Sequence, residues 1–245
     1  MDCSYINAHY LVALSLLNLL ISERNKGSLP QMIMKIIKSF QSKKNYVYLV
    51  QHKDSQAILK LFSNASHYMK EKTLYYEFKT TPLLIPEVIS YNDYHGFLVL
   101  EYIRSQNMLD LLENCERCHE VDKAVDLLDQ VLDWLMVFHH IPYVKENQLC
   151  FHDLNLRNFI SIRDTVYGID FESIECGSFQ EDVAKLIGMF LYYNPINSLF
   201  KQQVFMSLMP KLLKVTSLSK LNFEKLLHHE INCICQRRKI SVNML

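Results

Sequence analysis

The most constraining part of this sequence is CFHDLNLRNFISIRDTVYGIDFE, residues 150–172. Within it Asp153 is followed five residues later by Asn158, and Asp170 ends the apolar run VYGID. The segment between Asn158 and Asp170 reads as two short strands with a turn at Arg163-Asp164, which predicts a hairpin that gathers the three polar side chains. A carboxylate can orient a substrate hydroxyl, whereas an amide oxygen and a second carboxylate are hard ligands for Mg²⁺ on nucleotide phosphates.

These residues resemble the catalytic and metal-binding loops of the protein-kinase-like superfamily, and most of all its aminoglycoside phosphotransferase and choline kinase branch. In that branch D-x-x-x-x-N is followed by an apolar strand ending in I-D-F-E, and here the two elements read DLNLRN and GIDFE. Glu172 stands where protein kinases have the glycine of D-F-G, and Asn155 stands where Ser/Thr kinases usually have a lysine. The resemblance implies a catalytic Asp153, magnesium ligands Asn158 and Asp170, and accessory residues Glu172 and His152.

The preceding part of the chain is similar to the small lobe of this superfamily. Strand-like segments cover 34–40, 46–52 and 56–62, and the last of them, AILKLF, carries Lys60. The resemblance implies that Lys60 binds the α- and β-phosphates of ATP, whereas an ordinary strand lysine with its stem on apolar neighbours is the alternative. The next segment, 66–78, has apolar residues at helical spacing. It supplies the glutamate that would hold Lys60, with Glu71 preferred on spacing and Glu77 as the alternative.

Other nucleotide contacts follow from the same resemblance. The segment FQSKKNY, residues 40–46, has no glycine where the superfamily has a phosphate-covering loop, and Ser42 is the residue implied to touch phosphate; a solvated hairpin tip is the alternative. After a predicted strand over PLLIPEVIS, the string VLEYI is similar to a kinase hinge. It implies adenine contacts from the Glu101 carbonyl and the Ile103 amide, with Leu100 lining the pocket.

The later part of the chain reads as a helical lobe. Helical spacing predicts two helices between residues 107 and 141 and further helices after Glu172. Asp182, in EDVAKL, matches the family aspartate that braces the catalytic loop, with a plain helix N-terminal carboxylate as the alternative. Asp182 follows Asp170 by twelve residues and no A-P-E string is present, so a small-molecule acceptor is favoured over a protein. Phe151 stands where the family usually has histidine.

Composition bounds the class of protein. A chain of 245 residues with 49% hydrophobic residues suits one large domain or two small lobes. With 26 basic and 26 acidic residues, nothing favours nucleic acid or an anionic membrane as the main partner. The apolar run 10–21 is too short for a transmembrane segment and is expected within a packed N-terminal helix, 5–23. Seven scattered cysteines favour a reducing, cytoplasmic setting.

Two other patterns in the sequence suggest alternative binding sites. Cys115, Cys118 and His119 spell C-x-x-C-H, the pattern of covalent haem attachment, and they also suggest a zinc half-site with Cys233 and Cys235. Ordinary reduced thiols are the favoured interpretation, since the spacings match no common zinc pattern. The basic segment QRRK, residues 236–239, is expected to be a solvated terminus rather than a binding site for an acidic partner or nucleic acid.

Together these observations predict an α+β, bilobal protein-kinase-like fold with a small β-rich N-lobe and a helical C-lobe. The expected limits are 1–32 for an N-terminal helical extension, 33–102 for the N-lobe and 103–245 for the C-lobe. The predicted function is ATP- and Mg²⁺-dependent phosphoryl transfer to a hydroxyl of a small molecule such as a sugar, aminocyclitol, choline-like compound or lipopolysaccharide core. The alternatives are a pseudokinase that binds nucleotide or acts as a scaffold, and a compact atypical protein kinase.

Overall fold

The computed structural model describes residues 34–42, 44–152 and 154–239 of the chain. These residues form two compact units. Unit 1 contains the described residues up to Lys72 together with Pro86–Tyr102, and unit 2 contains Thr73–Ile85 together with the described residues from Ile103 onward. The predicted N-terminal helix and the extension 1–32 lie outside the described residues, and the predicted domain limits stay a prediction.

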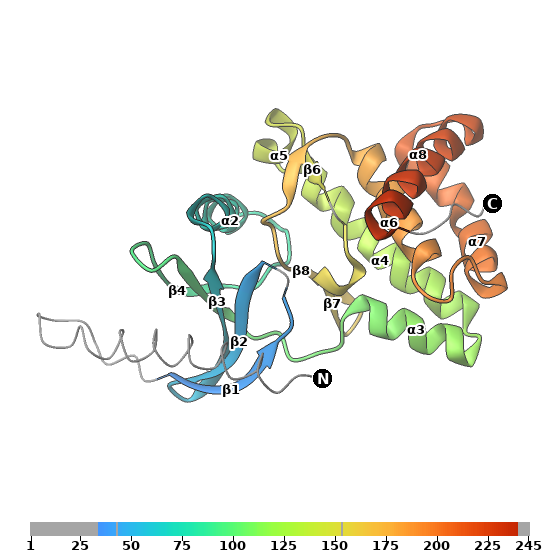
Figure 1. The fold of residues 1–245 in the computed structure, drawn as a ribbon. Helices are drawn as coiled ribbons and strands as arrows, with labels where there is room; N and C mark the ends of the chain where they lie inside the picture. The colour runs from blue at the N-terminus through green and yellow to red at the C-terminus, as the bar shows by residue number, and fades with distance from the viewer. Residues whose placement is uncertain (1–33, 43, 153, 240–245) are drawn as a thin grey trace, which may run out of the picture. The chain divides into compact units, whose positions relative to one another are not determined.

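Unit 1 is built on a five-stranded antiparallel sheet with the strand order β1-β2-β3-β5-β4 (Figure 1). The strands are β1 (Met34–Phe40), β2 (Asn45–His52), β3 (Ser55–Phe62), β4 (Val88–Asn92) and β5 (Phe97–Glu101). The first three confirm the predicted strands to within one residue. β2 pairs with β3 as far as His52 opposite Ser55, so Lys53 and Asp54 form a two-residue turn, with Lys53 at φ 54°.

One face of this sheet is apolar. Because successive side chains of a strand point to opposite faces, Leu59 and Leu61 of β3 share a face. They belong to a buried cluster with Met34, Tyr48, Val50, Ala57, Phe97 and Val99. Burying each of the large side chains contributes about 2 kcal/mol to stability. Lys60 lies between the two leucines in sequence and therefore points to the opposite face of the sheet.

The predicted strand over PLLIPEVIS is only partly right. β4 begins at Val88, and the residues from Leu83 to Glu87 are not in a strand. Pro82 and Pro86 have no N–H group and cannot donate to a strand ladder, which explains the late start. Hydrogen bonding to β5 nevertheless begins one residue before β4, because the Glu101 N–H donates to the Glu87 carbonyl at 2.8 Å.

Helix α2 (Ala65–Phe78) contributes to both units, because the division falls between Lys72 and Thr73. The helix starts after Asn64, whose Oδ1 accepts the Ser66 N–H at 2.8 Å. Its predicted apolar face is confirmed. The residues of that face are at most 3% exposed, namely Tyr68, Leu74, Tyr75 and Phe78.

Unit 2 is mainly helical and runs from green to red in Figure 1. Its helices are α3 (Met108–Cys118), α4 (Val121–His140), α5 (Pro142–Glu146), α6 (Phe179–Tyr192), α7 (Leu199–Thr216) and α8 (Lys220–Arg238). The first two confirm the helices predicted between residues 107 and 141. Side chains of Asn107, Ser178, Ser198 and Ser219 each accept a backbone N–H in the first turn of α3, α6, α7 and α8. Within the described part of the chain, no helix is long and apolar enough to cross a membrane.

Short strands frame the stretch 150–172. β6 (Leu149–Phe151) pairs with β9 (Ile174–Cys176), and β7 (Phe159–Ile162) pairs with β8 (Thr165–Gly168). A 3₁₀ turn, η2 (Leu156–Asn158), precedes β7. The β7–β8 pair confirms the predicted hairpin, and its turn residues Arg163 and Asp164 have φ angles of 44° and 64°.

Trp134 of α4 organises the aromatic core of unit 2. Its ring is stacked on Phe138 at 5.7 Å and nearly parallel to Phe171 at 6.4 Å, and it meets Phe159 edge-on at 5.3 Å. Its Nε1–H donates to the Leu84 carbonyl at 2.9 Å, which satisfies the one polar group of the ring. One tryptophan therefore fixes α4, the hairpin and the segment that follows Asp170 against one another.

Gly168, at the end of β8, leaves no room for a side chain. A Cβ there would lie 2.2 Å from Cζ2 of Trp134, whose ring is held by its bond to Leu84. We expect Gly168→Ala to lower the free energy of unfolding by about 3 kcal/mol, measured by urea denaturation, because overpacking forces the ring or the strand to move. Gly188→Ala in α6 is the matched control, since the nearest atom to its Cβ would be the flexible Cδ1 tip of Ile234 at 3.1 Å. Equal effects of the two substitutions would contradict this account.

Candidate functional site

Unit 1 contains a buried ion pair. Lys60 Nζ lies 2.7 Å from Glu71 Oε2, and the side chains are 7% and 0% exposed. The alternation of β3 directs Lys60 away from the apolar cluster, and α2 brings Glu71 within reach of it. Of the two glutamates predicted as partners, Glu71 makes the pair and Glu77 is exposed. Removing either member would leave the other charge buried without its counter-ion, which is strongly destabilising.

The residues predicted to contact adenine lie on or after β5. Leu100 is paired with Ile58 on one side and Val88 on the other, and it is 5% exposed. Glu101 is the last residue of β5 and is exposed, whereas Ile103 is buried and belongs to unit 2. The structure therefore places Leu100 inside the sheet and Glu101 at its end.

Ser42 lies in the connection between β1 and β2, where the superfamily has its phosphate-covering loop. The residue is exposed, and its Oγ accepts the Asn45 N–H at 3.3 Å. The hydroxyl is thus held close to the start of β2 while remaining open to solvent.

The β7–β8 hairpin brings Asn158 and Asp170 to one end of unit 2. Phe159 pairs with Gly168, and beyond that pair the Ile169 N–H donates to the Asn158 carbonyl at 2.8 Å. Asn158 therefore lies across the open end of the hairpin from Ile169, the residue before Asp170. Both side chains are partly exposed, as ligands of a hydrated cation need to be.

Asp170 has a left-handed backbone with φ 67°. Aspartate is one of the few residues that tolerate this conformation, because its short polar side chain can bond locally. The next residue, Phe171, is fully buried, with its ring 5.2 Å from Tyr75 and 5.4 Å from Phe78. Burial of this ring fixes the turn. One carboxylate oxygen of Asp170 and one of Glu172 lie within 4.8 Å, and two carboxylates so close favour a bound cation.

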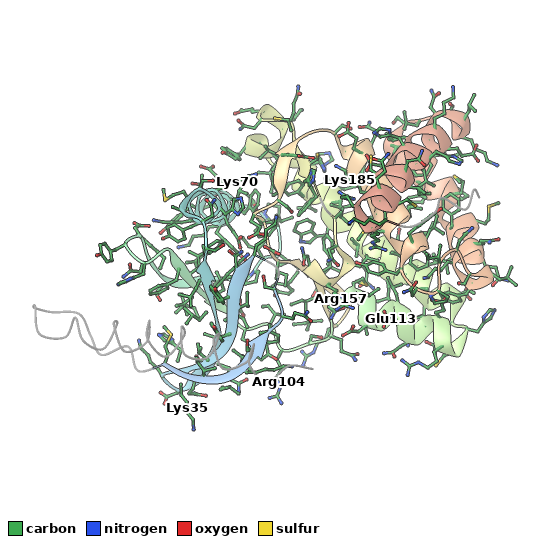
Figure 2. All side chains as sticks on the ribbon, in the orientation of Figure 1. Lys35, Lys70, Arg104, Glu113, Arg157 and Lys185 are labelled. Carbon is green, nitrogen blue, oxygen red and sulfur yellow. The ribbon has the colours of Figure 1, made fainter. Side chains whose placement is uncertain are left out.

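Helix α6 holds both polar groups of Phe151, two residues before Asp153. The Phe151 N–H donates to Asp182 Oδ1 at 2.9 Å, and its carbonyl accepts from Lys185 Nζ at 2.6 Å. Residues three apart share a helix face, so one turn of α6 supplies both partners; Lys185 is labelled in Figure 2. Burial raises the pKa of the Asp182 carboxyl, while His139, Lys185 and the Phe151 N–H act in the opposite direction.

Asp153 lies outside the described residues, and its neighbours are firmly bonded. The His152 N–H donates to the Ser173 carbonyl at 2.8 Å, and His152 Nδ1 lies 2.7 Å from Glu175 Oε1 in an exposed pair. On the other side, the Asn158 N–H donates to the Asn155 carbonyl at 2.8 Å. The loop is thus anchored before and after Asp153.

Two residues of this arrangement were missed at the level of sequence. Lys185 was not singled out, although a lysine in the apolar helix FQEDVAKLIGMFLY was a usable signal. His139 was given no role, yet its Nε2 lies 2.8 Å from Asp182 Oδ2. Phe151, which stands in place of the family histidine, is 2% exposed and packs against Phe138 at 5.2 Å. Phe151 is thus packed in the core, and the imidazole that contacts Asp182 belongs to His139 of α4.

The cysteine patterns form no metal site. Cys115 is buried, which raises the pKa of its thiol, while Cys118 is exposed and His119 is the C-cap of α3. Among the residues described, no group of three or more ligating side chains includes these residues, Cys233 or Cys235. The described cysteines are free thiols.

Comparison with solved structures identifies the fold. The chain is similar to a thermostable mutant of aminoglycoside phosphotransferase APH(4)-Ia, crystallised as a ternary complex with ADP and hygromycin B. The TM-score is 0.51 at 12% sequence identity, over 87% of this chain and 88% of that chain. Another crystal structure of aminoglycoside phosphotransferase APH(4)-Ia gives a TM-score of 0.49 at 16% identity, over 82% of this chain and 84% of that one.

The likeness to the ternary complex confirms the predicted α+β, kinase-like fold. No family model matches the chain, and no curated protein is significantly similar to it.

Removing the Asp182 carboxylate should destabilise the fold strongly. In Asp182→Ala the Phe151 N–H loses its acceptor and the buried Lys185 loses its counter-ion. We expect the free energy of unfolding to fall by about 4 kcal/mol. Asp133→Ala is the control, since that carboxylate is 57% exposed and pairs with Lys211 at 3.0 Å; its loss should cost about 0.5 kcal/mol. If Asp182→Ala lowered the free energy of unfolding as little as Asp133→Ala, the proposed role of Asp182 in holding Phe151 would be wrong.

Cys150 should resist alkylation. Burial raises the pKa of its thiol to about 12, and the thiolate is the reactive form. At pH 8 we expect iodoacetamide to label the exposed Cys118 and Cys176 in the folded protein but to label Cys150 only in urea, as read by mass spectrometry. An unfolded thiol ionises at about pH 8.5, so the stability linked to protonated Cys150 is complete below that pH and is lost as the pH rises. Equal labelling of Cys150 and Cys118 would contradict its burial.

Proposed function

We propose that this protein transfers the γ-phosphoryl group of Mg·ATP to a hydroxyl group of a small molecule. The observation that carries the proposal is the buried pair of Lys60 and Glu71, 2.7 Å apart in unit 1. Apolar residues would fill this position at a lower desolvation cost, so stability alone does not explain a buried ion pair. A lysine held rigidly by a glutamate is the arrangement that kinases use to bind nucleotide phosphates.

Each nucleotide contact is assigned to a residue already described. Lys60 binds the α- and β-phosphates, and Glu71 holds Lys60 in place. Leu100 lines the adenine pocket, and the Glu101 carbonyl and Ile103 amide bond the adenine edge. Ser42 touches phosphate from the β1–β2 connection, where its exposed hydroxyl is held close to the start of β2.

The donors at the open end of the hairpin suit Mg²⁺. Asn158 and Asp170 supply an amide and a carboxylate oxygen, which are the hard ligands that this ion prefers. Glu172 lies close enough to Asp170 to assist with metal or acceptor binding. The bound ion would supply neutralisation of charge on the phosphates.

Asp153 is the proposed catalytic residue, which orients the acceptor hydroxyl for in-line attack, with His152 as its accessory neighbour. Phosphoryl transfer asks for positioning and charge stabilisation rather than covalent help. The bonds that Asp182 and Lys185 make to Phe151 supply such positioning. We accordingly assign Asp182 as the structural brace of the loop.

A small-molecule acceptor is proposed for two reasons. Asp182 follows Asp170 by only twelve residues, which leaves no room for a segment that presents a peptide. The ternary complex with a similar fold holds ADP and hygromycin B. Sugars, aminocyclitols, choline-like compounds and lipopolysaccharide cores are the candidate classes. Free thiols favour a cytoplasmic setting, and zero net charge gives no reason to expect a nucleic-acid partner.

A pseudokinase that binds nucleotide without turnover, or serves as a scaffold, is the second candidate. It is favoured by Phe151 in place of the family histidine and by the glycine-free segment 40–46. The presence of Asp153, Asn158 and Asp170 together favours catalysis. The two functions differ in whether bound ATP is consumed.

Nucleotide binding is tested by thermal unfolding with ATP, with and without Mg²⁺. A ligand at one hundred times its dissociation constant stabilises the folded state by about 2.7 kcal/mol, which raises the melting temperature by several degrees. Asp170→Asn should lose the Mg²⁺-dependent part of this shift. Asparagine suits the φ of 67° better than alanine, so the change removes the charge without straining the turn.

Asp126→Ala is the charge-matched control, because Asp126 is exposed on α4. It should respond to Mg·ATP as the wild type does. Absence of any shift in the wild type at millimolar Mg·ATP would remove the basis of the proposal. If the shift is present, an acceptor screen with Asp153→Asn as the inactive control separates the two candidates: phosphorylation of an acceptor by the wild type alone identifies the enzyme.

A further inference from the structure

The basic segment 236–239 is exposed to solvent, as predicted, but its two arginines also make contacts within unit 2. Gln236, Arg237 and Arg238 form the last turn of α8, and Lys239 is its C-cap. Both arginines donate hydrogen bonds within unit 2, to carbonyl groups 85 and 46 residues earlier in the sequence. The segment therefore has a structural role that its composition did not indicate.

Arg237 reaches the residue directly before Asp153. Its Nη1 donates to the His152 carbonyl at 3.2 Å. The His152 N–H donates to the Ser173 carbonyl at 2.8 Å, so both backbone polar groups of His152 are bonded. The bond from Arg237 is charge-assisted, and such bonds are stronger than neutral ones.

Arg238 contacts the last residue of α6 and the C-cap residue that follows it. Its Nη1 donates to the Tyr192 carbonyl at 2.6 Å, and its guanidinium carbon lies 4.9 Å from the centre of the Tyr193 ring. Lys201 of α7 holds the same tyrosine, since its Nζ donates to the Tyr193 carbonyl at 2.6 Å. Backbone and ring of Tyr193 are thus held by separate cations.

Tyr193 in turn contacts Asn155, which lies two positions after Asp153. Its hydroxyl donates to Asn155 Oδ1 at 2.6 Å. The same Oδ1 accepts the Arg157 N–H at 3.0 Å and so caps η2, the turn that ends at Asn158. The contacts run from Arg238 through Tyr193 and Asn155 to the turn that carries a proposed metal ligand.

We propose that Arg237 and Arg238 of α8, together with Tyr193 at the end of α6, are positioning residues that hold His152 and Asn155, on the two sides of Asp153. Arg237 binds the carbonyl of His152, the residue before Asp153. Arg238 contacts Tyr193, whose hydroxyl binds Asn155, two residues after Asp153. The anchoring of His152 and Asn155 follows from the contacts alone. Its consequence for phosphoryl transfer rests on the proposed function.

Hydrogen–deuterium exchange of the full chain tests the anchor directly. Tyr193→Phe removes only the hydroxyl, and Arg238→Lys keeps the charge while losing the flat guanidinium. We expect amide exchange in peptides covering 152–158 to be about tenfold faster in both variants and in Arg237→Ala, since each loses one strong hydrogen bond or its geometry. Lys225→Ala, an exposed cation on α8, should exchange like the wild type. Unchanged loop exchange in Tyr193→Phe and Arg238→Lys would overturn the proposal.

A kinetic measurement then tests the consequence. With Mg·ATP and hydrolysis as the readout, Tyr193→Phe should lower kcat about tenfold while KM for ATP changes less than about twofold, because the loss falls on the reacting geometry. Equal melting temperatures of variant and wild type would exclude a general loss of structure. If kcat is unchanged while exchange is faster, the positioning role is wrong. If the wild type neither binds nor hydrolyses ATP, the proposed function fails, and exchange alone decides whether the anchor exists.

Discussion

The start of the loop that follows Phe151 depends on two opposite charges, Asp182 and Lys185, which are buried on one turn of α6. Asp182 and Lys185 take the N–H and the carbonyl of Phe151, and His139 binds the second oxygen of Asp182. Burying these charges costs free energy that their hydrogen bonds offset only when all partners are in place. Few other arrangements of the chain would satisfy them. The position of Phe151, and with it the start of the loop 152–158, is thereby defined narrowly.

The same logic of burial operates at the other end of the stretch 150–172. Asp170 adopts a left-handed backbone, which is unfavourable for most residues. The fully buried ring of Phe171 keeps it there, in an aromatic cluster that includes Trp134. Strain at a polar residue is thus balanced by apolar packing at its neighbour. Such residues are common where a side chain must be presented at a fixed angle.

Unit 1 and unit 2 each fix their share of the proposed chemistry internally. In unit 1 a buried glutamate orients Lys60. In unit 2 the hairpin places Asn158 opposite Ile169, the residue before Asp170, and the end of α8 reaches His152 and, through Tyr193, Asn155. None of these contacts calls for a covalent intermediate. They agree with a reaction whose acceleration comes from positioning and electrostatics.

The sequence by itself determined the local structure and the kinds of chemistry available. Strand-like segments predicted the first three strands of unit 1, helical spacing predicted α2, α3 and α4, and the Arg163-Asp164 turn predicted the hairpin, because these depend on dihedral preferences and near neighbours. Tertiary structure decided that Lys60 meets Glu71 rather than Glu77, about 240° further around α2. It also decided that the brace includes His139 and Lys185 and that the basic end of α8 is bonded rather than free, because those contacts join residues far apart in sequence, which no local pattern encodes.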